Sequence, residues 1–185
     1  MSPAPAIIAR LSGSEAINLV RSGQATVEQI AQSCLQRYRE RDEQVKAWAY
    51  LDPEQVLREA RKIDALPVKG PLAGLMVGVK DVIQTYGVSH SLLNRVDADP
   101  QPDMPTQYNS SIYKDHQANV DADCVKVLRT AGALIFGKTT TTEFAATVQG
   151  PKTSNAHDVE RTPGGSSSGS VGHSSLPETH PLFSS

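Results

Sequence analysis

Two features of the sequence have residue types that could do acid–base or nucleophilic chemistry. Lys80 directly follows a short apolar run, and a Gly/Ser-rich stretch occupies residues 164–170. Burial at the end of a strand would disfavour the charge of the lysine and lower its pKa. A base needs this lowering, because a lysine of ordinary pKa is neutral in only about one molecule in 2,500 at pH 7. The serine hydroxyls could then act as nucleophile or proton relay.

Each feature also has a purely structural interpretation. Lys80 could pair with a neighbouring carboxylate or extend its amine to the surface. The Gly/Ser stretch could be a flexible linker, since glycine and serine resist packing. Composition alone favours the linker, and the position of Lys80 alone favours neither interpretation.

A third pattern, from Gly132 to Thr139, fits the phosphate-binding motif GxxxxGK[ST] letter for letter. That loop has to leave a strand and wrap phosphates with free backbone N–H groups before a helix begins. Here the intervening Ala-Leu-Ile-Phe would itself be a buried strand, and a helix precedes the first glycine. We therefore interpret the segment as a helix stop, a strand and a turn, and expect no nucleotide binding.

Local signals predict helices in the N-terminal third of the chain. Capping boxes begin at Ser12 and Thr26, each with Glu or Gln three residues later. Apolar residues recur at helical spacing over residues 27–38. Asp52, followed by a proline, is a typical N-cap for a third helix.

Further along the chain the hydrophobic period changes. Residues 75–79 form a short apolar run that indicates a buried strand ending at Lys80. Residues 121–130 indicate a helix, and residues 133–136 a second strand. This alternation predicts an α/β protein with a partly parallel sheet. The polar connection over residues 89–117 is long enough to be a lid, a binding loop or an insertion.

Composition excludes several classes of function. Lys and Arg number 18 against 20 Asp and Glu, for a net charge of −2, so we expect no nucleic-acid partner. No apolar run approaches the roughly 20 residues that cross a bilayer, the opening residues do not form a signal peptide, and we expect no membrane partner. The five histidines show no ligand spacing, so no metal is expected. Cys34, on an apolar helical stripe, predicts a buried free thiol and a reducing, cytoplasmic setting.

Several ordered motifs resemble those of the amidase-signature family. Residues 71–81 resemble its lysine motif, residues 123–144 its following helix and strand, and residues 161–170 (Arg-Thr-Pro-Gly-Gly-Ser-Ser-Ser-Gly-Ser) its Gly/Ser signature. The resemblance covers roughly residues 10–170. It implies an α/β/α fold with a mixed sheet flanked by helices, incomplete here, in which residues 1–170 are the N-terminal part of a single amidase domain.

The resemblance also implies a chemistry. A Ser–Ser–Lys triad would hydrolyse the carbon–nitrogen bond of a carboxamide without a cofactor. Lys80 would be the general base, and Ser166 would be the relay serine, preceded by a cis Gly165–Ser166 peptide bond. Backbone N–H groups near the nucleophile would form the oxyanion hole. The expected partner is a small-molecule amide, while the particular amide and the oligomeric state stay open.

The sequence departs from the family pattern after Ser170. In the family the nucleophilic serine follows the relay serine by about two dozen residues, which counted from Ser166 falls beyond Ser185. The family continues into an Ala-rich helix, whereas the segment here contains two prolines, which break helices. We therefore expect a chain truncated before the nucleophile and inactive, with residues 171–185 a divergent, disordered tail. The alternative is a non-catalytic binding or regulatory fragment of an amidase.

Overall fold

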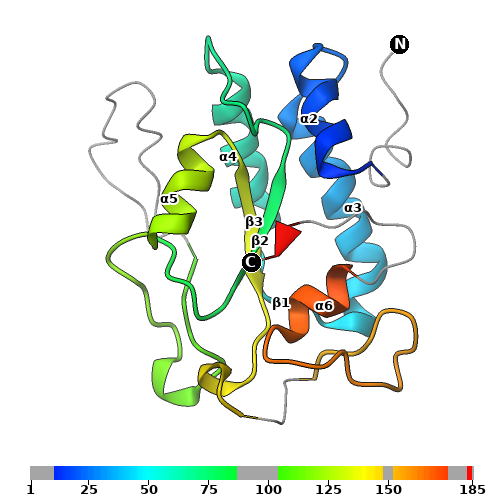
Figure 1. Ribbon diagram of the computed structural model, residues 1–185, viewed down its shortest axis with the longest axis vertical. Coiled ribbons are helices and arrows are strands. Elements are labelled where there is room, and N and C mark those ends of the chain that lie inside the picture. Colours follow the sequence, from blue (N-terminus) through cyan, green and yellow to red (C-terminus); the bar gives the residue numbers. More distant parts are fainter. Residues whose placement is uncertain (1–10, 87–103, 148–151, 175–182, 185) are drawn as a thin grey trace.

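The centre of the protein is a four-stranded mixed sheet. The computed structural model describes residues 11–86, 104–147, 152–174 and 183–184. The strands, in the order β1-β3-β2-β4, are β1 (Trp48–Tyr50), β3 (Leu134–Thr139), β2 (Met76–Lys80) and β4 (Phe183–Ser184). β3 is parallel to β2 and antiparallel to β1, and β4 is parallel to β2. This sheet with its flanking helices (Figure 1) confirms the expected α/β class.

Three helices precede or follow the first strand, and each begins where its capping residue predicted. They are α2 (Gly13–Arg21), α3 (Val27–Val45) and α4 (Pro53–Asp64). Ser12 and Thr26 both complete reciprocal capping boxes, and the Asp52 side chain accepts a hydrogen bond from the first turn of α4. These side chains satisfy backbone N–H groups that have no partner within the helix.

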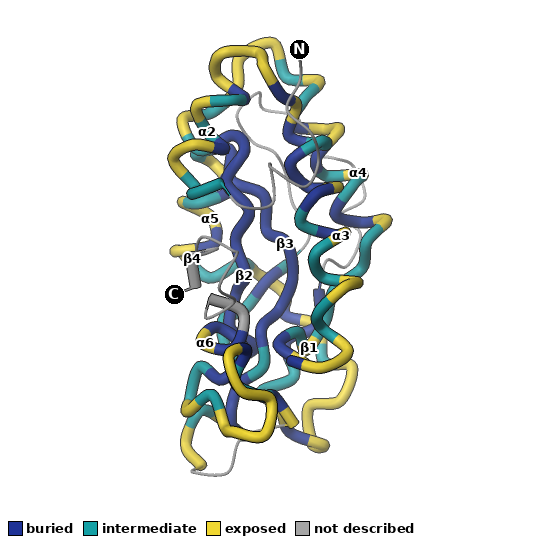
Figure 2. The backbone as a smooth tube through the Cα atoms, turned by 90° about the vertical axis from the view of Figure 1, so that its right-hand side faces the viewer, coloured by how far each residue is buried: buried dark blue, intermediate teal, exposed yellow. Residues whose placement is uncertain are grey.

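The two central strands are buried on both faces, and their side chains alternate between two layers. Leu134 and Phe136 pack in one cluster with apolar residues of α3 and α4. Ile135 points into a second cluster with Val125 of α5 (Asp123–Thr130). Figure 2 shows β2 and β3 as a continuous buried core with α3 and α4 along one side. The strands therefore hold their C-terminal residues at one fixed edge of the sheet.

The segment that fits the phosphate-loop pattern is a helix stop and a strand, as predicted. The backbone N–H of Gly132 closes α5 by donating to the carbonyl of Arg129, and its φ of +91° is one that glycine adopts without strain. Gly137 and Lys138 lie inside β3, which continues to Thr139, three residues beyond the predicted end. Their N–H groups are not arranged as a phosphate cradle.

The C-terminal segment contains two further elements. Helix α6 (Ser168–Ser174) continues four residues beyond Ser170, and Phe183–Ser184 pairs with β2. The expectation of a divergent, disordered tail over residues 171–185 stays a prediction. The prolines that break a helix, Pro177 and Pro181, lie after the end of α6. Residues 175–182 lie outside the described part of the chain.

The long polar connection is described from Met104 onward; its earlier residues, from 89 to 103, lie outside the described ranges. It contains a 3-10 turn, η2 (Ser111–Tyr113), and a second such turn, η3 (Glu143–Ala145), follows β3. Cys34 is a free thiol, as predicted, and it is half-buried against the helical core rather than fully buried. No helix in the described ranges has the length and apolar character to cross a membrane.

Candidate active site

Lys80 and Ser166 lie together although 86 positions separate them. The Lys80 Nζ is 2.6 Å from the Ser166 Oγ and donates a hydrogen bond to it. Lys80 is the last residue of β2, and Ser166 lies in the loop that leads into α6. This contact confirms the proximity that the resemblance implied.

The Gly/Ser stretch is a packed loop, so the linker interpretation is wrong. Its Gly165–Ser166 peptide bond is cis, as the resemblance implied. The Ser166 carbonyl accepts a 3.1 Å hydrogen bond from the Thr142 N–H, and the Gly169 N–H donates to the Thr140 carbonyl at 3.0 Å. A Cβ at Gly169 would collide with the Ala47 carbonyl and the Thr140 amide. Only glycine therefore lets α6 approach the end of β3 closely enough to present Ser166 to Lys80.

Lys80 has the environment that a basic amine requires. Its side chain is buried, with 9% of its surface exposed, and burial lowers the pKa of its amine below the ordinary value. Among the described residues no carboxylate forms an ion pair with it. Both structural interpretations of Lys80, pairing with a carboxylate and extension to the surface, therefore fail within the described chain.

A second buried lysine, Lys138, has the opposite environment. It is fully buried, and its Nζ donates to the carbonyl of Ile83 at 2.9 Å, to that of Pro105 at 3.3 Å and to the Thr106 hydroxyl at 2.7 Å. It also lies 3.4 Å from the Asp81 carboxylate. The Lys138 amine thus bonds to three oxygens and faces a carboxylate, whereas the Lys80 amine bonds to one serine hydroxyl. Sequence analysis missed this network, although a lysine inside an apolar strand was a signal for it.

Asp81 connects Lys138 to the loop around η2. Its carboxylate accepts a hydrogen bond from the Gln107 N–H at 3.2 Å, and its carbonyl accepts one from the Tyr108 N–H at 3.0 Å. Burial raises the pKa of the Asp81 carboxyl, and the charge of Lys138 opposes that rise. Asp81 thus holds Gln107 and Tyr108 beside the end of β2.

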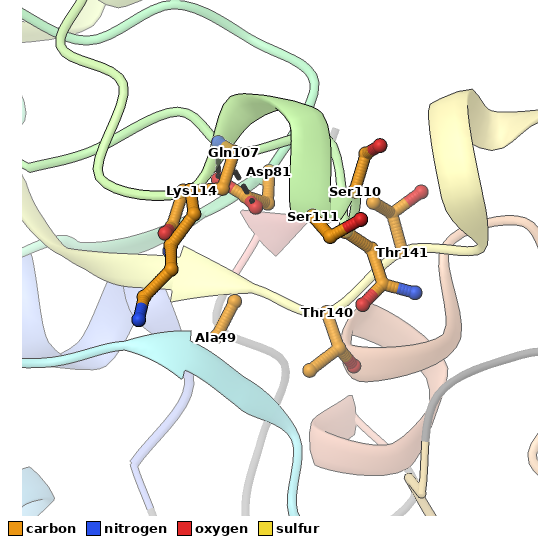
Figure 3. A pocket seen from close by; sticks show the side chains of 9 residues that line it. Ala49, Asp81, Gln107, Ser110, Ser111, Lys114, Thr140 and Thr141 are labelled. Carbon is orange, nitrogen blue, oxygen red and sulfur yellow. Dashed lines mark hydrogen bonds between the residues drawn. The ribbon is translucent and has the colours of Figure 1, made fainter.

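A pocket of about 300 Å³ lies at this edge of the sheet (Figure 3). Ligands of open α/β sheets commonly bind outside the carboxyl ends of the strands, which is where this pocket lies. Among the described residues no group of three His, Cys, Asp or Glu side chains could hold a metal ion. The lining consists of Ala49, Asp81, Gln107, Asn109, Ser110, Ser111, Lys114, Thr140 and Thr141.

A buried lysine bonded to a serine of a Gly/Ser loop, on a mixed sheet flanked by helices, is the arrangement that the sequence motifs implied. The chain belongs to the amidase family, whose model matches residues 29–172.

Its relatives are similar over most of its length. A glutamyl-tRNA(Gln) amidotransferase subunit of Salinispora tropica is 35% identical over 169 residues, which is 86% of this chain and 31% of the relative. The chloroplastic/mitochondrial counterpart from Arabidopsis thaliana is 35% identical over 159 residues, 81% of this chain and 26% of the relative. This chain thus spans about a third or less of these relatives.

Solved structures agree with the sequence comparison. The native peptide amidase of Stenotrophomonas maltophilia superimposes with a TM-score of 0.73 at 26% identity, covering 90% of this chain and 34% of the amidase. An amidase crystal structure matches at 31% identity with a TM-score of 0.69, covering 94% of this chain and 38% of the other. The fold of the described residues is therefore that of amidases.

Proposed function

We propose that this protein takes part in hydrolysis of the carbon–nitrogen bond of a carboxamide, with Lys80 as general base and Ser166 as proton relay. The observation that supports this proposal is the 2.6 Å contact between the two side chains. Burial adds to it by lowering the pKa of Lys80. A base works best when its pKa is close to the working pH, and this shift is in that direction.

The proposed proton path follows from this geometry. Neutral Lys80 takes the proton of the Ser166 hydroxyl, and Ser166 in turn takes the proton of an attacking serine. The attacking oxygen adds to the amide carbon, the C–N bond breaks, and the leaving nitrogen receives the proton that Lys80 and Ser166 hold. The acyl group then sits on the attacking serine as an ester, which a water molecule hydrolyses after giving a proton to the same relay. Ser166 therefore has to touch both Lys80 and the nucleophile.

We further propose that the 185-residue chain alone does not turn over amides. Among the described residues the Ser166 hydroxyl has one hydrogen-bond partner, Lys80. No nucleophile from this part of the chain is therefore in place at the other end of the relay. The alternative of a binding fragment is compatible with the same geometry, because a pocket lies at the same edge of the sheet.

Two measurements test the proposal. The purified chain should hydrolyse simple amides no faster than buffer, and turnover that disappears in Ser166→Ala would contradict the inactivity. In a chimaera, residues 1–172 of this chain replace the matching part of the Stenotrophomonas peptide amidase. There, Lys80→Met and Ser166→Ala should each lower the rate about 10²–10⁴-fold. Val171→Ala, at an exposed position of α6, is the control, and a folded Lys80→Met chimaera of full activity would disprove the role of Lys80.

A further inference from the structure

A second pair of hydroxyls lies on the same face of the sheet as the Lys80 side chain. Thr139 is the partner of Lys80 in the register of β2 and β3, and register partners in adjacent strands project to the same face. The Thr139 Oγ1 is 3.2 Å from the Oγ of Ser170 in α6. Both residues are buried, with 1% and 5% of their surface exposed. A side-chain hydrogen bond therefore connects β3 to the helix that follows Ser166.

Both branches of the Thr139 side chain are in use. Its methyl carbon lies 2.9 Å from the place that a Cβ on Gly78 would occupy. Gly78 precedes Lys80 by two residues in β2, so both face the same side of the sheet. Thr139 thus leans across to β2 with its methyl and reaches α6 with its hydroxyl. A threonine presents both groups from one Cβ whose χ1 angle is restricted.

The contact belongs to a series of hydrogen bonds between the end of β3 and the segment around Ser166. They run in order along the two segments, and they join Thr139 to Ser170, Thr140 to Gly169, and Thr142 to Ser166. The second and third use backbone groups only. The first is therefore the one that depends on the type of both residues, and it is the one level with Lys80 in the sheet.

We propose that Thr139 and Ser170 are positioning residues that hold Ser166 against the Lys80 amine. Among the described residues neither hydroxyl bonds to Lys80 or to Ser166, so the pair acts through the placement of α6. Fixing this helix to β3 keeps the loop in place and keeps water away from the amine. A displacement of about 1 Å in such a pair can lower a rate about 10²-fold. As a statement about catalysis, this inference rests on the proposed function.

The first test measures the titration of the Lys80 amine in the full chain. Thr139→Val keeps the shape of the side chain and removes its hydroxyl, and Ser170→Ala removes the partner. If α6 moves away, water reaches the amine and weakens the desolvation that lowers its pKa. Carbon-detected NMR should therefore give a Lys80 midpoint closer to 10.5 in each variant than in the parent. The double variant should shift it no further than either single variant, because each alone breaks the same bond.

Two controls separate this hydrogen bond from general loosening. Thr139→Ser keeps the hydroxyl and should keep the parent midpoint. Thr153→Val removes another buried hydroxyl, which lies 2.6 Å from the Thr140 Oγ1 and donates to the Lys46 carbonyl at 2.8 Å. It should lower the melting temperature and leave the Lys80 midpoint unchanged.

The outcomes that overturn the inference follow from these controls. They are a parent midpoint in folded Thr139→Val and Ser170→Ala, or a shift in Thr139→Ser or Thr153→Val as large as in Thr139→Val. If Thr139→Val fails to fold, Ser170→Ala decides, since alanine is favourable in a helix.

The chimaera separates this inference from the proposed function. There, Thr139→Val and Ser170→Ala should lower kcat about 10- to 10²-fold with little change in KM, because they displace a proton relay and not a substrate contact. Fully active Lys80→Met and Ser166→Ala chimaeras would overturn the hydrolytic function, whereas the Lys80 midpoint of the full chain would still support or reject the positioning. An unchanged kcat in Thr139→Val beside an inactive Lys80→Met would overturn the positioning role alone.

Discussion

The amine of Lys80 lies within 2.6 Å of the Ser166 hydroxyl and is buried at the end of β2. Burial lowers the pKa of this amine below the ordinary 10.5, so folding shifts its protonation equilibrium toward the neutral form. A carbon-detected NMR titration of the lysine side chains should therefore give a midpoint for Lys80 below 10.5. Titration at or above that value would contradict the description of Lys80 as a base.

The same shift predicts a dependence of stability on pH. A lowered pKa in the folded state means that protonated Lys80 destabilises the fold, whereas neutral Lys80 does not. The contribution of Lys80 to the free energy of unfolding therefore increases as pH rises from its folded pKa to 10.5, and it is constant outside this window. Urea melts should show that the free energy of unfolding of the parent chain, minus that of Lys80→Met, increases with pH across this window. A constant difference would contradict the shift.

Lys138 should be a major determinant of stability. Lys138→Met removes the charge that faces buried Asp81 and the donor for two carbonyls. Loss of one partner of a buried pair costs about 3–5 kcal/mol, which a denaturant melt measures. The double variant Lys138→Met with Asp81→Asn should recover part of that loss.

The control is an exposed lysine. Lys126→Met interrupts a surface pair with Asp123 and should change the free energy of unfolding by no more than about 0.5 kcal/mol. A loss from Lys138→Met as small as this would show that the buried network contributes little.

Much of the fold follows from local chemistry that a sequence displays. The capping residues Ser12, Thr26 and Asp52 act on backbone groups within one turn, so each helix start was predictable. The Lys80–Ser166 contact was predictable only through the resemblance of the motifs to a family. The position of Lys80 alone did not decide between a base and a structural lysine, because a lysine after an apolar strand has several possible partners.

The features that sequence analysis missed depend on tertiary contacts. The acceptors of Lys138 come from residues 32 to 55 positions away, and nothing in the spacing of the chain indicates them. The pocket hydroxyls Ser110 and Thr141 belong to a polar loop and a strand end, which have no period. Helix α6 was missed because sequence analysis expected Pro177 and Pro181 to exclude a helix from the whole segment, whereas both lie after its end.

Gly169 should be essential for the position of α6. Its Cβ-free backbone contacts Ala47 and Thr140, so Gly169→Ala should push the helix away from β3. Overpacking of this kind costs about 1–3 kcal/mol, and it should also move the NMR signals of Lys80. Val171→Ala, at a position 40% exposed, should leave both the stability and these signals nearly unchanged. An unaltered Lys80 signal in Gly169→Ala would contradict the proposed dependence.

The two cysteines should differ in reactivity. Burial raises the pKa of the Cys34 thiol to about 12, whereas Cys124 is exposed. Because the thiolate is the reactive form, iodoacetamide at pH 8 should alkylate Cys124 and spare Cys34 in the folded chain, as measured by mass spectrometry of peptides. Denaturation should make both react. Equal labelling in native buffer would show that α3 opens readily.

The separation of Lys80 and Ser166 by 86 positions also bears on the order of folding. Bringing together two points so distant along a chain costs conformational entropy before any contact compensates for it. The parallel pairing of β2 with β3 and the bond from Gly169 to Thr140 bring α6 close to Lys80. We therefore expect the sheet to assemble first and the two side chains to meet late, so that the contact between them forms in one of the last steps of folding.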